Sequence, residues 1–385
     1  MARVDDNPPD IPPLGPLRIL DFSRILAGPF ATMLLADLGA DVIKVERPGA
    51  GDETRSWGPP FDAQRRATYF QSVNRNKHSV VLDLTAEADL ARARELARGA
   101  DVVVENFRPD VMDKLGLGYG QLSAENAGLI FCSITGFGAG AGAELPGYDL
   151  LVQALGGLMS ITGSPEGEPQ KVGVALVDVL AGLFASVGIL AALRHRDRTG
   201  EGQRVEVSLL SALLAGLVNQ ASAYTIAGSV PGRMGNAHPS ISPYELYATG
   251  EGDLVLAVGN ERQFAALCEV LGAPELQTDP RFGSNSDRVS NRAALKEELV
   301  ARLASAPASE WAARLTAARV PAGVVNDLAG AFALARSVGL DPVVDVPSAD
   351  VPSADGPPVA LTRNPIGLSR TPPTYRSAPP DLPTH

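Results

Sequence analysis

The sequence is poor in cysteine and in histidine. It contains two cysteines, Cys132 and Cys268, and only four histidines among 385 residues. Two cysteines far apart in apolar segments do not form the disulfide framework of a small secreted domain, so we expect a reduced, cytoplasmic compartment. The histidines do not cluster with Cys, Asp or Glu at the spacing of metal ligands, and we expect no metal site.

Positive charge is also in deficit. The formal net charge is −11, which disfavours non-specific binding to nucleic acid or to an anionic membrane. Residues 1–14 are acidic and rich in proline, and they lack the basic and apolar regions of a signal peptide. We therefore expect them to form a disordered tail.

The first half of the chain alternates strand-like and helix-like segments, as expected of an α/β fold with a doubly wound parallel sheet. The expected strands are 17–22, 41–46, 101–107 and 129–135, and the expected helices are 27–40 and 85–100, the second capped by Thr85. A Gly-, Pro- and Ser-rich stretch at 224–247 indicates a domain boundary. A smaller α+β region follows, with strands at 253–260 and 322–327 and helices at 261–272, 291–306 and 308–320.

One acidic residue lies inside a long apolar stretch. Residues 172–194 are apolar or small almost throughout, and Asp178 is the only charged side chain before the end. The length would span a membrane, but the Ala and Gly content and the internal Asp disfavour that interpretation. Two compatible interpretations remain: a helix-start carboxylate satisfied by backbone N–H groups, and a catalytic carboxylate kept ionised at a helix N-terminus.

Two local patterns carry no chemistry of their own. The segment 136–141, GFGAGA, matches a loose dinucleotide fingerprint, but Pro146 interrupts any helix that would open there, so we expect a flexible loop. The tandem VPSAD repeat at 346–355 is expected to be a lengthened surface loop.

Several stretches together resemble the class III CoA-transferase family, the group of formyl-CoA transferase and carnitine CoA-transferase. They run in the family's order from about Leu17 to the end of the chain, and the longest lie at 20–55, 74–84, 101–119, 147–163, 174–182, 198–209, 236–260 and 281–295. The resemblance implies a Rossmann-like large domain built from both chain ends (15–223 and 331–385), a small α+β domain (224–330), and an interlocked homodimer.

The resemblance also implies the site. Asp178, in VALVDVLAG, matches the catalytic aspartate. The implied CoA contacts are Ile25, Leu26, Ala27, Arg47, Leu82, Asp83, Leu84, Thr85, Asn106, Phe107, Arg108, Lys114, Pro146, Gly147, Tyr148 and Asp149. CoA carries phosphates, so an acidic protein must place positive charge locally, and Arg47 follows a strand end, where α/β sheets bind ligands.

The implied reaction moves CoA from an acyl-CoA thioester to a free carboxylic acid through an aspartyl anhydride and an aspartyl-CoA thioester. CoA is then a substrate, and no cofactor is permanently bound. Backbone N–H groups near the start of the 179–193 helix are candidates for stabilising the oxyanions. The chain has MGNAHPSISPY where the formyl-CoA type has a run of glycines, and it stops where relatives usually continue into a final helix.

Two alternatives stay open. An α-methylacyl-CoA racemase is similar in sequence but needs a His–Asp acid–base pair. This chain has Tyr148 at the position of that histidine, and a phenol with a pKa near 10 is a poor base at neutral pH. The other alternative is a non-catalytic acyl-CoA-binding protein.

Overall fold

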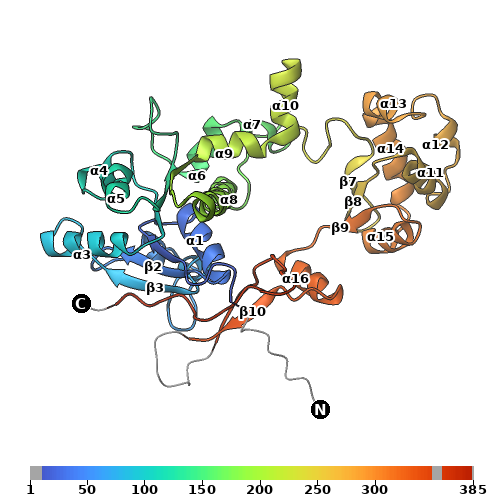
Figure 1. The fold of residues 1–385 in the computed structure, drawn as a ribbon. Coiled ribbons are helices and arrows are strands. Elements are labelled where there is room, and N and C mark those ends of the chain that lie inside the picture. The colour runs from blue at the N-terminus through green and yellow to red at the C-terminus, as the bar shows by residue number, and fades with distance from the viewer. Residues whose placement is uncertain (1–10, 349–357, 384–385) are drawn as a thin grey trace, which may run out of the picture. The chain divides into compact units, whose positions relative to one another are not determined.

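The structure, a computed structural model, describes residues 11–348 and 358–383. The chain divides into two compact units (Figure 1). Unit 1 holds residues up to 158, 172–229 and the segment from 341 onward, and unit 2 holds residues 159–171 and 230–340. Each unit is described by itself below.

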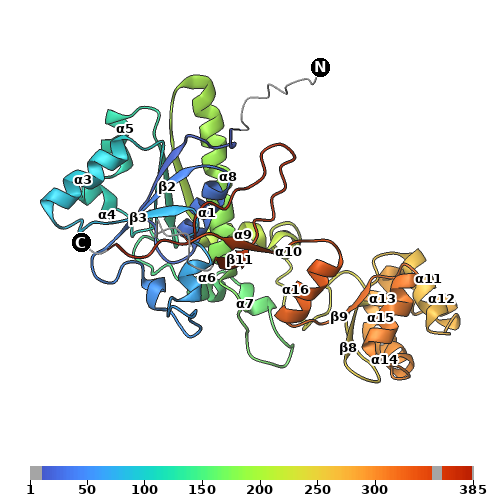
Figure 2. The same cartoon turned by 90° about the horizontal axis from the view of Figure 1, so that it is seen from below.

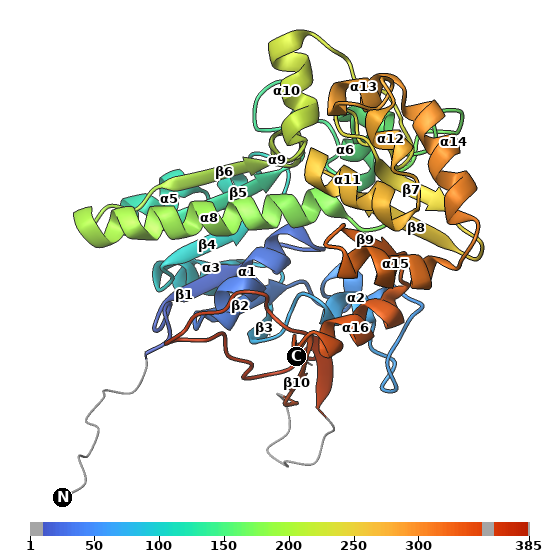
Figure 3. The ribbon, with the colours of Figure 1, turned by 90° about the vertical axis from the view of Figure 1, so that its right-hand side faces the viewer.

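Unit 1 is built on a six-stranded parallel sheet with the order β3-β2-β1-β4-β5-β6, whose strands can be followed in Figure 3. This is the strand order of doubly wound nucleotide-binding folds. The strands are β1 (Arg18–Asp21), β2 (Asp41–Glu46), β3 (Lys77–Val81), β4 (Val102–Glu105), β5 (Ile130–Thr135) and β6 (Arg204–Ser208). The α/β fold class expected from the sequence is confirmed.

Helices cover both faces of this sheet (Figure 2). On one face α1 (Ala27–Asp37) packs against α8 (Leu176–Thr199), and α8 also contacts β5 and β6. On the other face lie α3 (Glu87–Arg98) and α5 (Tyr119–Glu125), whose Ala93, Ala97 and Leu122 join a buried core with strand side chains such as Val103 and Phe131. Helix α8 has the length and apolar composition of a membrane span, yet it contacts this sheet, α1 and the helices α6 (Asp149–Leu155) and α9 (Leu209–Gly216).

The remaining helices of unit 1 are short. They are η1 (Glu53–Ser56), α2 (Thr68–Gln71), α4 (Val111–Lys114), α6 (Asp149–Leu155), α9 (Leu209–Gly216) and α10 (Val218–Ala227), while α7 (Leu158–Ile161) begins at the end of unit 1 and continues into unit 2. The expected cap of the 85–100 helix is wrong: the helix begins at Glu87, after an N-cap Ala86 that makes no side-chain bond. The Thr85 hydroxyl instead donates to Asp83 at 2.6 Å, closing a local turn.

The C-terminal segment returns to unit 1 through a buried ionic contact. Asp37, at the end of α1, accepts hydrogen bonds from Arg75 (2.6 Å), Asn76 (2.8 Å) and Asn364 (3.0 Å). The segment also carries an antiparallel pair, β10 (Val343–Val346) and β11 (Val359–Thr362). Most of the VPSAD repeat, and most of the expected N-terminal tail, lie outside the described residues.

Unit 2 is a separate α+β body. Its antiparallel sheet contains β7 (Tyr244–Ala248), β8 (Asp253–Ala257) and β9 (Ala322–Val324). Its helices are α11 (Glu261–Val270), α12 (Glu275–Thr278), α13 (Asn285–Ser290), α14 (Arg292–Leu303), α15 (Ala308–Ala317) and α16 (Leu328–Ser337). One buried core joins helices α11, α12, α14 and α15 to this sheet.

The units differ from the domain limits expected from the sequence. Residues 159–171 and 331–340 fall in unit 2, whereas the sequence analysis placed them in the large domain. Hydrogen bonds explain the first difference, because the Gly235 N–H donates to the Gly163 carbonyl at 3.0 Å and the Arg233 guanidinium donates to the Gly167 carbonyl at 2.9 Å. Helix α10 also continues to Ala227 in unit 1, past the expected boundary at 224.

Candidate active site

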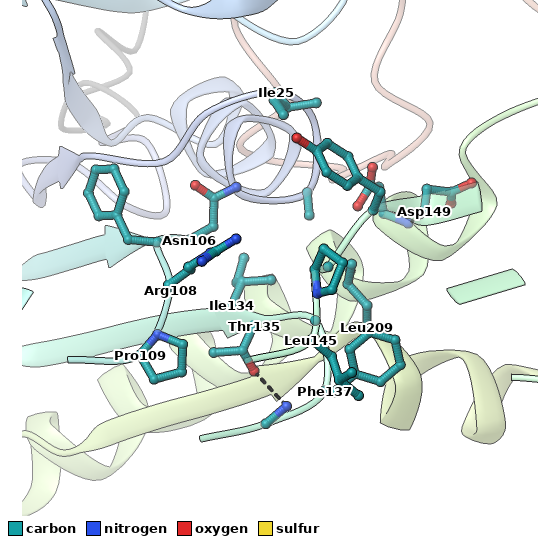
Figure 4. A pocket seen from close by; sticks show the side chains of 18 of the residues that line it. Ile25, Asn106, Arg108, Pro109, Ile134, Thr135, Phe137, Leu145, Asp149 and Leu209 are labelled. Atoms are coloured by element: carbon teal, nitrogen blue, oxygen red, sulfur yellow. Dashed lines mark hydrogen bonds between the residues drawn. The ribbon is translucent and has the colours of Figure 1, made fainter. Parts of the chain in front are cut away.

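A cavity of about 120 Å³ opens at the carboxyl ends of β1, β4 and β5. The strand order reverses between β1 and β4, and open α/β sheets bind ligands at that switch point. Three loops form the walls: residues 24–27 after β1, residues 106–109 after β4, and residues 136–149 after β5 (Figure 4). Asp178 and Leu209, from α8 and α9, complete the lining.

Asp178 lies in the first turn of α8 and is half-buried. Helix α8 approaches the start of α1 closely at Gly182, one turn after Asp178. A Cβ at Gly182 would lie 2.6 Å from the Ala27 carbonyl oxygen, so a glycine is needed for this contact. The close approach places Asp178 on the same cavity wall as Leu26 and Ala27.

A second carboxylate caps the helix that carries Asp178. Asp149, the first residue of α6, accepts hydrogen bonds from the backbone N–H groups of Val177 (2.8 Å) and Asp178 (3.3 Å). It also accepts one from the Gln153 side chain at 2.6 Å. Asp178 is a first-turn acid, as the sequence analysis allowed, but the expectation that backbone N–H groups satisfy its carboxylate is wrong, because they donate to Asp149.

The same bonds correct the sequence-based oxyanion candidate. The N–H groups at the start of α8 are all engaged: Val177 and Asp178 donate to Asp149, and Leu176 and Val179 donate to the carbonyls of Val174 and Ala175 at 2.8 and 3.2 Å. They are not available to a reacting oxygen. No hydrogen bond or ion pair reaches the Asp178 carboxylate from any residue that the structure describes.

The surroundings make Asp178 unusual for an aspartate. Burial raises the pKa of Asp178 to about 7, and the negative charge of Asp149 adds to the rise. The sequence analysis expected a helix N-terminus to keep this carboxylate ionised, and that expectation is also wrong because Asp149 already neutralises the helix start. Burial raises the pKa of Tyr69 as well, and the charges of Asp178 and Asp149 contribute, so this phenol lies within their field.

Two guanidinium groups line the cavity, from Arg24 and Arg108. Arg24 lies over the Phe107 ring at 5.0 Å and pairs with Glu53 at 2.8 Å. In Figure 4, Asn106 and Arg108 lie across the cavity from Asp149. The cavity thus combines cations suited to an anionic ligand with a carboxylate that has no partner of its own among the described residues.

The predicted site residues divide into two sets. One set lines the cavity: Ile25, Leu26, Ala27, Asn106, Phe107, Arg108, Pro146, Gly147, Tyr148, Asp149 and Asp178. The other set lies outside its lining: Arg47, Leu82, Asp83, Leu84, Thr85 and Lys114. Arg47 is nevertheless close to the first wall, because it shares Glu53 with Arg24, at 3.5 Å. The CoA contacts themselves stay a prediction.

The glycine-rich loop after β5 is part of the cavity wall and opens no helix; the next helix, α6, begins only at Asp149. This confirms that GFGAGA is not a dinucleotide fingerprint. The two ends of the loop touch through glycines, since a Cβ at Gly136 would lie 2.4 Å from the Gly147 Cα. This backbone contact holds the loop closed just before Tyr148 and Asp149.

Beneath the first wall lies a buried ionic cluster that sequence reasoning missed, made of Asp21, Lys44, Asp52 and Lys77. Lys44 pairs with Asp52 at 2.9 Å and Lys77 pairs with Asp21 at 3.2 Å, with all four side chains fully buried. Three of the four are charged residues within strands, Asp21 in β1, Lys44 in β2 and Lys77 in β3, whereas Asp52 lies in the loop before η1. Arg24 was also missed, although a cation directly after a strand end is the pattern used for Arg47.

Metal ligands are absent from the described part of the chain, where no group of three His, Cys, Asp or Glu side chains is placed to hold an ion. No histidine lies among the residues that line the cavity. Tyr148, at the position where the racemases have a histidine, lines the cavity and is 63% exposed. The His–Asp pair that racemase chemistry needs is therefore not formed at this cavity.

Comparison with known proteins shows the family of the chain. The sequence model of CoA-transferase family III matches residues 14–385. The succinate–glutarate CoA-transferase of Agrobacterium fabrum is 44% identical over 99% of this chain and 96% of its own length. The acetyl-CoA:oxalate CoA-transferase of Acetobacter aceti is 44% identical over 83% of each chain. A solved CAIB/BAIF family protein from Brucella suis superposes with a TM-score of 0.83, at 43% identity over 96% of each chain.

Proposed function

Since the chain belongs to CoA-transferase family III and is a class III CoA-transferase, we propose that it moves CoA between dicarboxylic acids with Asp178 as the nucleophile. The curated relatives described above are named for succinate, glutarate and oxalate, all dicarboxylic acids. The observation that carries the proposal is the Asp178 carboxylate. It is half-buried, has no described partner, and lies in a switch-point cavity lined by Arg24 and Arg108.

The proposed first half-reaction exchanges one activated acyl group for another. An Asp178 oxygen attacks the thioester carbonyl of the donor, the C–S bond breaks, and CoA leaves as a thiolate, so the product is a mixed anhydride. The thiolate then attacks the Asp178 carbonyl of that anhydride. The donor acid leaves as a carboxylate, and Asp178 carries CoA as a thioester.

The second half-reaction is the reverse with a new acid. The acceptor carboxylate attacks the aspartyl thioester and releases CoA thiolate, which attacks the acceptor's acyl carbon in the new anhydride. A new acyl-CoA forms and the Asp178 carboxylate is restored. Every bond that breaks is an activated acyl bond, so the cycle needs no ATP.

The raised pKa of Asp178 suits a nucleophile that must be reactive yet ionisable at neutral pH. With a pKa of about 7, roughly half of the carboxylates are ionised at pH 7. The ionised form has lost much of its hydration, which leaves it more reactive than an exposed aspartate. The nearby Arg24 and Arg108 also attract the anionic substrate to this site.

For the oxyanions we propose the start of α1 in place of the start of α8. The backbone N–H groups of Leu26 and Ala27 make no hydrogen bond within the described residues, and both residues line the cavity with Asp178. Helix N-termini stabilise negative charge, and preorganised N–H groups do so most strongly where charge develops in the transition state.

We propose further that the protein works as a homodimer in the cytoplasm. Unit 1 leaves apolar side chains exposed along α8 and α10, among them Leu183 (43%), Val187 (64%), Val218 (67%) and Ile226 (84%). Exposed apolar side chains in this number fit a protein interface. The chain path is compatible with an interlocked dimer, since unit 1 is built from both ends of the chain. Both cysteines are free and buried, which fits a reducing compartment.

The test of this function is a donor–acceptor screen. Purified protein is incubated with succinyl-CoA and a panel of mono- and dicarboxylic acids without ATP, and new acyl-CoA species are followed by mass spectrometry. We expect transfer to dicarboxylic acids, and a loss of at least about a thousandfold in Asp178→Asn, as is typical when a nucleophile is removed. Free CoA binding without turnover of any pair would support the acyl-CoA-binding alternative, and the absence of both would overturn the proposal.

A further inference from the structure

The turn that forms the first cavity wall has a strained backbone. Ile25 adopts φ +71°, in the left-handed region that β-branched residues strongly avoid. Its neighbours Leu26 and Ala27 line the cavity directly. A conformation of this kind persists only when its surroundings hold it, and it is found most often where a site must be preorganised.

Three side chains from elsewhere in the chain hold this turn. The Asn106 carboxamide makes a two-way contact with Arg24, accepting from its N–H at 2.9 Å and donating to its carbonyl at 2.8 Å. The Lys44 ammonium donates to the Ser23 carbonyl at 2.9 Å. The Asp52 carboxylate accepts from the Ile25 N–H itself, at 3.2 Å to Oδ2 and 3.4 Å to Oδ1.

Of these three, Asp52 alone bonds the strained residue, and its own position is fixed by charge. Lys44 reaches Oδ2 at 2.9 Å, while the Thr54 N–H (2.9 Å) and hydroxyl (2.7 Å) donate to Oδ1. Burial alone would raise the pKa of Asp52, but the Lys44 charge and the hydrogen bonds from Lys44 and Thr54 outweigh it and lower the pKa. The carboxylate is therefore held ionised and in one orientation.

We propose that Asp52 is a positioning residue for CoA binding: held by Lys44, it clamps the Ile25 N–H and so keeps residues 25–27 in the conformation that forms the cavity wall. Asp52 itself does not line the cavity, so it acts through the turn and touches no substrate. The inference rests on the proposed function, because it assigns the purpose of the clamp to the CoA site.

An amide in place of the Asp52 carboxylate breaks the clamp. A carboxylate offers acceptors on both oxygens, whereas the carboxamide introduced by Asp52→Asn has one acceptor oxygen and an NH₂ group that only donates. That amide cannot accept from Thr54 on one side and from both Lys44 and Ile25 on the other. Without its acceptor, Ile25 is free to relax to negative φ, and the wall formed by Leu26 and Ala27 moves.

The experiment measures the affinity for free CoA by calorimetry in Asp52→Asn, in Ile25→Gly and in the double variant. Glycine adopts positive φ without strain, so it needs no clamp. We expect Asp52→Asn to raise the Kd for CoA about tenfold, the change that a loss of about 1.4 kcal/mol in binding free energy produces. In the Ile25→Gly background the same change should cost less than about twofold, because residues in direct contact are coupled. In turnover, the loss from Asp52→Asn should fall on KM more than on kcat.

Asp37→Asn is the matched control. Asp37 is also a buried carboxylate, and it is bonded to a buried cation, Arg75, at 2.6 Å, but it touches no residue of the turn. Its amide variant should lose stability and keep CoA affinity within about twofold, as sites without shared partners are energetically independent. If Asp52→Asn does not fold, Thr54→Val removes one hydroxyl bond to Asp52 and should still weaken CoA binding about threefold.

If Asp52→Asn costs the same CoA affinity in the wild-type background as in the Ile25→Gly background, the clamp is overturned. Unchanged affinity in both Asp52→Asn and Thr54→Val would overturn it as well. Unchanged affinity in Thr54→Val would suffice on its own if Asp52→Asn does not fold. These outcomes differ from a failure of the proposed function, in which the wild-type protein itself binds no CoA.

Discussion

Unit 1 contains two groups of carboxylates, which differ in whether a cation is bonded to them. The acidic pair, Asp149 and Asp178, has no cation bonded to it among the described residues. The ionic cluster, Asp21, Lys44, Asp52 and Lys77, pairs each carboxylate with a buried lysine. Burial pushes the carboxyl groups of Asp21, Asp52 and Asp178 toward the neutral form. What differs is whether a neighbour stabilises the charge.

The pKa shifts follow that difference. In the cluster, burial would raise the pKa of Asp21, but the charges of Lys77 and Lys44 and hydrogen bonds from Ser23 and Thr32 lower it. At Asp178 no cation or hydrogen bond from the described residues offsets burial, and the pKa of Asp178 rises to about 7. A carboxylate whose charge is neutralised by a bonded cation stabilises the fold. A carboxylate without such a cation is available to react. The contrast separates positioning residues from the nucleophile.

Breaking the cluster should have the largest effect on stability. Lys77→Met leaves Asp21 buried without its nearest cation, since Lys77 donates to Asp21 at 3.2 Å and to the Pro29 carbonyl at 2.9 Å. We expect a loss of about 3–5 kcal/mol in the free energy of unfolding, measured by urea denaturation. Arg314→Met is the control: it removes the exposed pair with Glu310 and should cost less than about 1 kcal/mol. Equal losses of stability in Lys77→Met and Arg314→Met would contradict the structural role of the buried cluster.

Removing the Asp178 charge from the acidic pair should instead increase the stability of the protein. The native state binds the Asp178 proton more tightly than the unfolded chain does, because the pKa of Asp178 is about 7 in the folded protein and 3.8 in the unfolded chain. Wild-type stability therefore falls as pH rises from about 4 to about 7. Asp178→Asn avoids that loss and should be more stable than wild type by on the order of 2 kcal/mol at pH 8.

The difference between Asp178→Asn and wild type should shrink as pH falls toward 4, because Asp178 stays protonated in the folded chain and the unfolded chain takes up its proton as the pH approaches 3.8. Thermal unfolding at pH 4.5, 6 and 8 measures it. A variant that is less stable than wild type at pH 8 would mean that the Asp178 carboxylate holds the fold together, against this account.

A smaller effect is expected from the partner carboxylate. Asp149→Asn keeps an acceptor oxygen for the N–H groups of Val177 and Asp178 but removes the charge that helps to raise the pKa of Asp178. The pKa of Asp178 should fall, and the acid limb of the kcat/KM profile should move to lower pH. Asp149→Ala also removes the cap, at a cost of about 1 kcal/mol in stability. If the acid limb stays at the wild-type pH in Asp149→Asn, the limb does not report the ionisation of Asp178.

The contrast also shows what could be read from the sequence. Strands β1, β4 and β5 were predicted because their apolar runs are typical of buried parallel strands, and β2 (DVIKVE) because it completes the strand–helix–strand spacing. Strands β3 and β6, which lie at the edges of the sheet, were missed because β3 (KHSVV) has only a short apolar run and β6 (RVEVS) alternates apolar residues with Arg and Glu. Helix α16 was missed as well, since its exposed apolar residues give no clear boundary with the loops around it.

The candidate site was predicted in its parts but not in its arrangement. Asp178 stood out because a lone charge in an apolar run requires an explanation. Which carboxylate takes the helix N–H groups is decided by a contact between residues 149 and 177, far apart in the chain, and no local pattern encodes such a contact. The strain at Ile25 is likewise set by Asp52 and Asn106 across long loops, so only the folded chain reveals it.

The most direct test of the central claim is to trap the intermediate on Asp178. During turnover of succinyl-CoA with a dicarboxylic acid, hydroxylamine should convert the aspartyl thioester to a hydroxamate, and peptide mass spectrometry should find the change on the peptide that contains VALVDVLAG. The account predicts labelling at Asp178 that requires acyl-CoA and is absent in Asp178→Asn. Turnover with no label at Asp178, or with the label on another residue, would contradict it.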